Sequence, residues 1–172
     1  EIQYKVTDAV DGYDTTGGAR NAQGAYDLTN TFRQEYTSVS GKKVWVDGSS
    51  DVRPASVTVA LLADGVEVDR QTISAVEGSS EWAFTFGVSD GSAALPNYSA
   101  YNTAIAYTVR EAAPDGALVE LPEGSVTYTV GDSTLTYDVT YGDNYTITNT
   151  KPQDYSDVTI NKVWKDGSNA AG

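Results

Sequence analysis

Apolar and polar residues alternate along most of the chain. In residues 56–61, 81–86 and 104–109, every second side chain is large and apolar. A period of two is typical of β-strands that turn one face to a core and the other to solvent. No segment of about ten residues has the periodicity and capping residues of a helix. The pattern therefore predicts short, half-buried strands throughout.

Turn-forming dipeptides separate these stretches. Aspartate and glycine tolerate the backbone angles of tight turns, and they occur together at Asp47-Gly48, Asp64-Gly65, Asp90-Gly91, Asp115-Gly116, Gly131-Asp132 and Gly142-Asp143. In the long stretch 114–144, residues 126–130 and 134–139 flank one such turn and predict an added hairpin. Many short strands joined in this way predict an all-β protein, an antiparallel sandwich of roughly 100 to 120 residues.

Two sequence patterns occur twice, which indicates tandem repeats. The segment 43–49 (Lys-Val-Trp-Val-Asp-Gly-Ser) returns at 162–168 (Lys-Val-Trp-Lys-Asp-Gly-Ser), and Asn30-Thr31 returns as Asn149-Thr150 at the same spacing. Residues 4–9 likewise resemble residues 107–112. We therefore predict that residues 1–33 end one repeat, residues 38–152 form a complete repeat, and residues 157–172 begin a third.

The composition removes several kinds of chemistry. The 172 residues include no cysteine and no histidine, which excludes thiol and imidazole catalysis, disulfides and zinc fingers. With 11 basic and 24 acidic residues, the formal net charge is -13, which repels nucleic acid and anionic lipid. We expect no nucleic-acid partner, no membrane insertion within this segment and no cofactor. We expect no metal site either, because acidic turns such as 47–51 fit ordinary turn chemistry.

Three polar residues interrupt the apolar faces of the predicted strands. Lys43 shares a face with Val39 and Trp45, Glu111 continues the face of residues 105, 107 and 109, and Asn149 follows residues 145 and 147. The flanking parts keep the same phase at Asp8, Asn30 and Lys162. A polar residue in a core position is unfavourable unless it is paired or functional. Each repeat thus carries one lysine, one acid and one asparagine in core positions.

Two interpretations fit this set. In the first, each residue lies near a strand end and its polar group reaches solvent. In the second, a buried lysine amine attacks the asparagine carboxamide, expels ammonia and leaves an amide between the two side chains. Burial favours the neutral amine, the acid bonds the asparagine oxygen and carries protons, and packing holds the groups together.

Five motifs in order resemble the collagen-adhesin B-type (Cna B-type) repeat domain. They span residues 43–47, 53–65, 82–86, 107–111 and 145–150. The resemblance implies an immunoglobulin-like antiparallel β-sandwich, found in tandem stalks of Gram-positive surface adhesins and pilins. It also implies an isopeptide bond between Lys43 and Asn149, with Glu111 as the catalytic acid. In the flanking parts it implies that Asp8 and Asn30 belong to the preceding repeat and Lys162 to the following one.

These observations lead to two functional hypotheses. The first is a structural stalk or spacer repeat of a bacterial surface adhesin or fibre, which is not an enzyme beyond forming its own bond once. The second is a ligand-binding adhesin module that uses the insertion 114–144 or the loop 90–104. The expected partners are adjacent repeats and a host surface ligand bound by a distal domain. The expected location is extracellular, on the bacterial surface, with attachment to the cell wall through regions outside this sequence.

Overall fold

The structure is a computed structural model that describes residues 12–20, 22–48, 52–87, 94–99, 103–153 and 159–162. As the alternation predicted, these residues form strands and no α-helix, so none of them belongs to a helix that could cross a membrane. The strands are β1 (Tyr13–Arg20), β2 (Tyr26–Phe32), β3 (Tyr36–Thr37), β4 (Val39–Val46), β5 (Ser56–Ala63), β6 (Val66–Ser74), β7 (Glu81–Phe86), β8 (Leu95–Pro96), β9 (Tyr107–Ala112), β10 (Glu123–Val130), β11 (Ser133–Gly142) and β12 (Thr146–Thr150).

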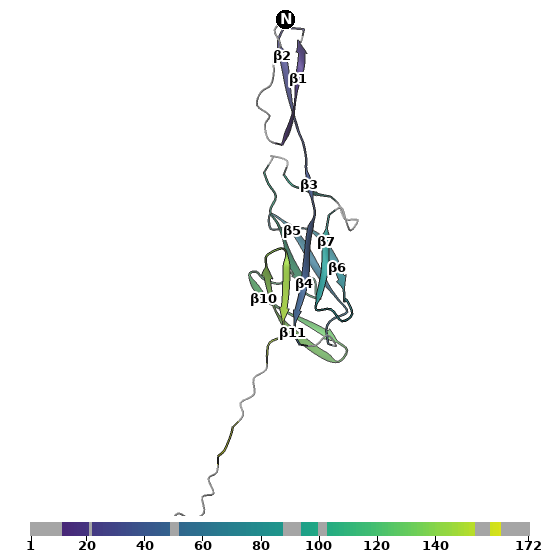
Figure 1. Cartoon of the computed structure of the whole chain (residues 1–172), viewed down its shortest axis with the longest axis vertical. Helices are drawn as coiled ribbons and strands as arrows, with labels where there is room; N and C mark the ends of the chain where they lie inside the picture. Colours follow the sequence, from purple (N-terminus) through teal and green to yellow (C-terminus); the bar gives the residue numbers. More distant parts are fainter. Residues whose placement is uncertain are drawn as a thin grey trace, which may run out of the picture.

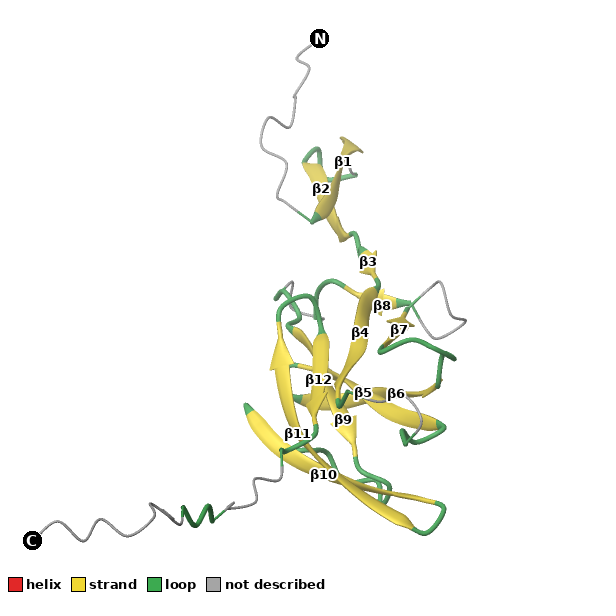
Figure 2. Ribbon diagram, turned by 60° about the horizontal axis from the view of Figure 1, so that its bottom comes forward, coloured by secondary structure: helices red, strands yellow, loops and turns green. Residues whose placement is uncertain are grey.

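Two sheets form the central immunoglobulin-like sandwich (Figure 2). One has the strand order β10-β11-β12-β4-β7, and the other has the order β6-β5-β9. Neighbouring strands are antiparallel except for β4 and β12, which are parallel. The first and last strands of the sandwich therefore lie side by side and run in the same direction. As a result, the chain enters at one end of the sandwich and leaves at the other (Figure 1).

The core lies between the sheets and is rich in aromatic side chains. Trp45 is at its centre, with ring centroids 5.1 Å from Trp82 and 5.0 Å from Tyr137. The rings are tilted or edge-on to one another, as aromatic pairs prefer. Aliphatic side chains of β5 and β12, such as Val59, Leu61 and Ile147, complete this core. Burial of this apolar surface is the main stabilising contribution to the sandwich.

The hairpin predicted within residues 114–144 is confirmed. Strands β10 and β11 pair from Glu123 opposite Thr140 to Val130 opposite Ser133, and the turn uses Gly131 with a φ of 59°. The hairpin is not an addition to the sandwich, however. Strand β11 also pairs with β12, and inward residues such as Val126 and Tyr137 are part of the core.

The strand predicted over residues 104–109 begins and ends later than expected, because β9 is Tyr107–Ala112. The turn of the neighbouring β5–β6 hairpin holds the preceding residues. The Asp64 side chain accepts a hydrogen bond from the Ala106 N–H at 3.0 Å, and the Asp64 N–H donates to the Ala106 carbonyl at 2.9 Å. Pairing with β5 therefore starts at Tyr107, opposite Ala63.

Strands β1 and β2 form a separate hairpin beyond the end of the sandwich where the chain enters (Figure 1). It is joined to β4 through β3, which pairs with β8. Most described side chains of the hairpin are exposed, although the Tyr13 and Phe32 rings meet edge-on at 5.6 Å. The assignment of residues 1–33 and 157–172 to neighbouring repeats stays a prediction.

Candidate functional site

The parallel strands β4 and β12 place Lys43 and Asn149 on the same inward face. Lys43 lies opposite Ile147 and Asn149 lies opposite Trp45, so the two polar residues are diagonal neighbours on adjacent strands. Side chains alternate between faces along a strand. The alternation that buries Val39 and Trp45 therefore buries Lys43 as well, and the alternation that buries Ile147 also buries Asn149.

A glycine allows β12 to start close against β4. Gly41 precedes Lys43 by one full period of the strand, and a Cβ atom at this position would collide with the Tyr145 backbone oxygen and the Phe84 ring. Tyr145 itself has a φ of 54°, as part of the turn from β11 into β12. The absence of a side chain at Gly41 thus allows the turn that aligns Asn149 beside Lys43.

Glu111 reaches both residues from the opposite sheet. It lies on β9, opposite Val59 of β5. Its Oε1 accepts a hydrogen bond from Asn149 Nδ2 at 3.0 Å, and its Oε2 lies 3.7 Å from Lys43 Nζ. The sandwich therefore brings together the lysine, the acid and the amide that the sequence singled out, although these residues come from three different strands.

All three side chains are fully buried, with 0% exposure for Lys43, Glu111 and Asn149. Their polar groups do not reach solvent at strand ends, so the first of the two interpretations drawn from the sequence is wrong. A charged group removed from water is strongly disfavoured unless it is well paired. Lys43 Nζ has only one hydrogen bond among the described residues, to the Val44 carbonyl at 3.3 Å. Its other close neighbours are Glu111 Oε2 at 3.7 Å and the Trp45 ring, whose centroid is 4.3 Å away.

Burial lowers the pKa of the Lys43 amine from 10.5 to about 8, and the nearby Glu111 carboxylate opposes part of this decrease. Desolvation disfavours the ammonium ion, while an adjacent negative charge favours it. At neutral pH the neutral amine is therefore far more accessible than in an exposed lysine. A neutral amine has the lone pair that a nucleophile requires.

Two acceptor atoms at the site are buried without a hydrogen-bond partner among the described residues, Glu111 Oε2 and Asn149 Oδ1. Unsatisfied buried acceptors are rare in folded proteins and unfavourable. Both atoms belong to groups that the proposed chemistry would change.

The orientation of the Asn149 carboxamide differs from the expectation that the acid bonds its oxygen. In the structure the amide nitrogen faces Glu111. The reason is the polarity of hydrogen bonds: an ionised carboxylate can only accept, so it selects the N–H donors, whereas a protonated carboxyl could donate to Oδ1. The observed arrangement is thus the one that suits the carboxylate and ammonium forms.

Sequence reasoning missed a fourth polar group at the site. The hydroxyl of Tyr128, on β10, donates a short hydrogen bond to Glu111 Oε1. The period-two pattern of residues 126, 128 and 130 does place Tyr128 on an inward face, and a buried tyrosine hydroxyl usually needs a partner. That signal was available, but the identity of the partner depends on how the sheets pack.

A second group of residues, from the motifs 43–47 and 53–65, closes the site on the side of Trp45. Arg53 donates to both oxygens of Asp47, at 2.8 and 2.7 Å, and to the Ser79 carbonyl at 2.7 Å. Its guanidinium carbon lies 5.8 Å from the Trp45 ring. Asp47 is thus engaged by an arginine, and the described residues contain no cluster of acidic side chains that could hold a metal ion.

Where the structure describes the residues predicted for the flanking repeats, they lie on the surface. Asn30 is exposed on β2, where Thr15 Oγ1 donates to its Oδ1 at 2.7 Å. Lys162 is exposed in the short described stretch 159–162, and Asp8 lies outside the described residues. Their assignment to sites of neighbouring repeats stays a prediction.

Comparison with known proteins gives a consistent family. The Cna protein B-type domain matches residues 39–150. A collagen adhesin of Staphylococcus aureus is 33% identical over 150 residues, which cover 84% of this chain and 12% of the adhesin. The chain therefore spans only a small part of the curated relative that it matches.

Two solved structures of the collagen-binding protein from the same organism are also similar. A pair of B repeat units (B1B2) has 28% sequence identity and a TM-score of 0.46, over 84% of this chain and 31% of that one. A single B repeat unit (B1) has 28% identity and a TM-score of 0.42, over 68% of this chain and 47% of that one.

Proposed function

Because the chain belongs to the Cna protein B-type domain family, we propose that residues 38–152 form a structural spacer repeat of a bacterial surface adhesin or fibre. In this proposal an amide bond between the Lys43 and Asn149 side chains locks the repeat. The observation that carries it is the contact of a buried amine, a buried carboxyl group and a buried carboxamide. The reaction occurs once in each folded domain, so the repeat is not a turnover enzyme.

The proposed reaction begins with a proton transfer from Lys43 Nζ to Glu111 Oε2, the carboxyl oxygen that lies 3.7 Å away. The neutral amine then attacks Asn149 Cγ, a new C–N bond forms, and the bond from Cγ to Nδ2 breaks. One more proton moves from Nζ to the departing nitrogen, with Glu111 as the carrier, so that ammonia leaves. One proton stays on the new amide and one stays on the carboxyl group.

Packing accelerates the reaction in this proposal. Rigid placement of two reactants replaces diffusion by a high effective concentration, and the three strands that carry these groups are fixed by the core. The reaction also removes the buried ammonium and carboxylate charges, which are unfavourable in a dry interior. Both effects depend on a complete sandwich, since Glu111 comes from one sheet and the other two residues come from the other.

The strand topology supports a mechanical role. Tension on a tandem chain would enter through β4 and leave through β12, which are adjacent and parallel (Figure 2). An amide between Lys43 and Asn149 would carry this tension directly, so that the strands between them bear none. By analogy with disulfides, closing a loop of about 100 residues adds about 4.7 kcal/mol to the free energy of unfolding.

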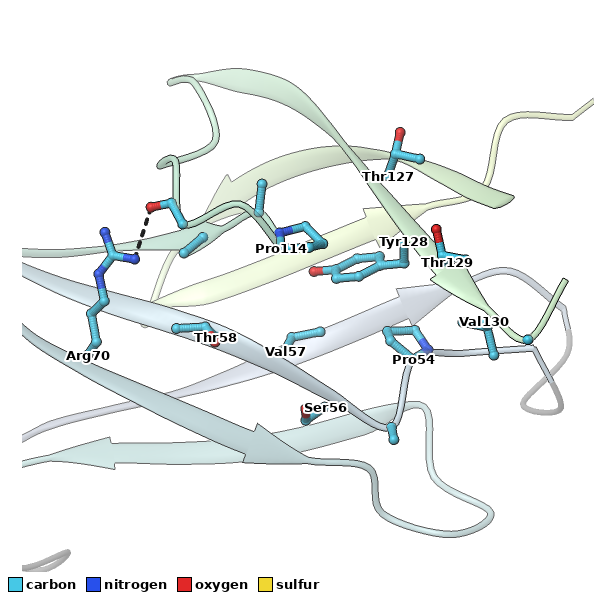
Figure 3. Close-up of a pocket in the computed structure, with 15 residues that line it drawn as sticks. Pro54, Ser56, Val57, Thr58, Arg70, Pro114, Thr127, Tyr128, Thr129 and Val130 are labelled. Atoms are coloured by element: carbon cyan, nitrogen blue, oxygen red, sulfur yellow. Dashed lines mark hydrogen bonds between the residues drawn. The ribbon is translucent and has the colours of Figure 1, made fainter. Parts of the chain in front are cut away.

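The alternative of a ligand-binding module gains less support. The insertion 114–144 uses the inner face of β10 and β11 for the core. A groove of about 700 Å³ does lie between β10 and residues 54–58 (Figure 3). Arg70 is the charged side chain in its lining, and it is bonded to Glu67 and to the Gly116 carbonyl. Part of the loop 90–104 lies outside the described residues, so its role stays a prediction.

The family and the adhesin relative also support a location for this repeat. We infer that it stands outside the cell on a Gram-positive surface, attached to the cell wall through other regions of its protein. Its partners would then be adjacent repeats of the same chain, and a distal domain would bind the host ligand. As a spacer, the repeat needs a stable and inextensible fold more than a binding surface of its own.

Intact-mass measurement of the purified chain tests the proposal. We expect a mass about 17 Da below that of the sequence, which is the loss of one ammonia on acyl transfer to an amine. Lys43→Ala, Glu111→Ala and Asn149→Ala should each restore the unmodified mass. Lys42→Ala is the matched control, because Lys42 is the adjacent lysine and forms a surface ion pair with Glu81 at 2.8 Å; it should keep the loss. An unmodified mass in the wild type would reject the bond.

A further inference from the structure

Tyr128 contacts the acid of the site at the carboxyl oxygen that does not face Lys43. Its hydroxyl donates to Glu111 Oε1, whereas Lys43 faces Glu111 Oε2. We propose that Tyr128 is a positioning residue for amide formation: by occupying Oε1, it makes Oε2 the oxygen that exchanges protons with Lys43. This inference rests on the proposed function of the site.

The two carboxyl oxygens of Glu111 differ in their hydrogen bonds. Oε1 accepts from both Tyr128 and Asn149 Nδ2, while Oε2 accepts none from the described residues. A carboxyl proton is best placed on the oxygen whose lone pairs are not already used by donors. The oxygen with free lone pairs is also the one that faces the amine, so a proton that leaves Lys43 is directed to Oε2.

Tyr128 is suited to hold the carboxyl group and unsuited to carry the proton itself. Burial raises the pKa of its hydroxyl well above the ordinary value, and the nearby Glu111 charge adds to this increase. The phenol therefore stays protonated at neutral pH and remains a hydrogen-bond donor. A permanent donor can fix the orientation of a carboxyl group without competing for the proton in transfer.

The ring of Tyr128 is held in place by its neighbours. Its centroid lies 6.3 Å from that of Trp45 and 6.5 Å from that of Tyr137. On another side the residue lines the groove between β10 and residues 54–58, where Figure 3 shows it close to Val57 and Pro114. Removal of the hydroxyl alone leaves the ring in this position, so Tyr128→Phe tests the hydrogen bond without opening the site.

The chain offers a matched control. Tyr137 packs against the same Trp45 ring, at 5.0 Å between centroids, and its buried hydroxyl has no hydrogen-bond partner among the described residues. Tyr137→Phe therefore removes a buried phenol hydroxyl from the same aromatic cluster, and it leaves the contacts of Glu111 unchanged. If the loss of a buried hydroxyl acted only through packing, Tyr128→Phe and Tyr137→Phe would form the bond at the same rate.

The experiment follows amide formation in newly made protein. The full chain is synthesised in a cell-free reaction, samples are quenched in acid at intervals, and the fraction that has lost ammonia is read from the intact mass. Resistance to a protease confirms that each variant is folded at the sampling times. We expect Tyr128→Phe to react about tenfold to a hundredfold more slowly than the wild type, the scale of loss when a reacting group is misplaced. Tyr137→Phe should react at the wild-type rate.

A third variant keeps the test informative if Tyr128→Phe folds poorly. Replacement of Tyr128 by 4-aminophenylalanine retains an N–H donor in the position of the hydroxyl and should recover most of the wild-type rate. Recovery supports the inference. Equal rates for Tyr128→Phe and the wild type would overturn it, as would equal slowing of Tyr128→Phe and Tyr137→Phe. In either of these cases the proposed function stands, whereas a wild type that never loses ammonia rejects the proposed function itself.

Discussion

The β1–β2 and β11–β12 hairpins carry the same short pattern, an aliphatic residue two positions before an asparagine, in opposite environments. Strand β2 contains Leu28 and Asn30, and β12 contains Ile147 and Asn149 at the corresponding positions. Leu28 is 62% exposed and Asn30 is exposed, whereas Ile147 and Asn149 are both 0% exposed. The strand sequence alone therefore does not create the site. Its asparagine becomes part of a buried cluster only where β4, β9 and β10 surround it.

The hydrogen bonds of the two asparagines show what this difference means chemically. Asn30 Oδ1 accepts from the hydroxyl of Thr15 at an exposed position, where water can serve as an additional partner. Asn149 Oδ1 is buried without a partner among the described residues, next to a lysine with a lowered pKa. The proposed bond thus depends on the completed sandwich, and four experiments test this contrast between the two asparagines and their surroundings.

The largest difference is expected between Asn149→Ala and Asn30→Ala. The first should abolish the loss of ammonia and lower the free energy of unfolding by about 5 kcal/mol, the contribution of a closed loop of about 100 residues. The second should change neither quantity by a measurable amount, because surface substitutions usually have effects within about 0.5 kcal/mol. Mass spectrometry and denaturant unfolding give both results. Equal effects of the two changes would remove the distinction between the hairpins.

The two aliphatic residues of the pattern, Ile147 and Leu28, should differ by somewhat less in their contribution to the free energy of unfolding. Ile147→Ala leaves a cavity in the core and should lower the free energy of unfolding by about 2–5 kcal/mol. Leu28→Ala should stay within about 0.5 kcal/mol, since its side chain is mostly in water already. Thermal unfolding of the two variants measures the difference. A large loss for Leu28→Ala would indicate that Leu28 itself packs against other parts of the chain in solution.

The pH dependence of stability should reveal the buried lysine when the bond is absent. In Asn149→Ala, the Lys43 pKa of about 8 lies below the value of 10.5 for the unfolded chain. Below about pH 8 both states hold the proton and the burial penalty is complete. Between about pH 8 and 10.5 only the unfolded state binds it, so the free energy of unfolding should rise with pH, by up to about 3 kcal/mol.

Denaturant unfolding at several pH values measures this increase. The wild type is the control, since in the proposed bond the Lys43 nitrogen is an amide that does not titrate. The same increase in the wild type would assign the effect to other groups.

The smallest expected difference in stability is between alanine substitutions at Gly41 and at Gly17. Gly41→Ala would force a Cβ atom against the Tyr145 backbone and the Phe84 ring, and overpacking of this kind costs about 1–3 kcal/mol. Gly17→Ala on β1 meets only ordinary contact with Leu28 at 4.0 Å, so it should be neutral or slightly stabilising. Comparison of melting temperatures checks this prediction. A neutral Gly41→Ala would show that the approach of β12 to β4 is less tight than the structure indicates.

Much of the fold followed from local pattern, because alternation of apolar side chains directly reports which face of a strand is buried. The same alternation placed Lys43, Glu111 and Asn149 on inward faces, where the structure has them. The β10–β11 hairpin was also readable, since residues 131–132 form a strong turn signal. The roles of Lys43, Glu111 and Asn149 in bond formation stay a prediction.

Long-range features could not be read in this way. The start of β9 at Tyr107 depends on hydrogen bonds from the turn at Asp64, which lies far away in sequence. The parallel pairing of β4 with β12 joins the two ends of the domain, and no local pattern encodes it. The contact of Tyr128 with Glu111 depends on how the two sheets pack. Each of these features arises from tertiary contacts and not from strand propensity.

Trp45 gives the molecule an optical reporter of its own chemistry. Its indole has the Lys43 nitrogen 4.3 Å from the ring centroid, and indole emission responds to charges at this range. Conversion of an ammonium ion to an amide would remove a positive charge from beside the ring while leaving the ring in place. The fluorescence of the wild type should therefore differ from that of Asn149→Ala, so that the maturation of a single repeat can be followed with light and without any added label.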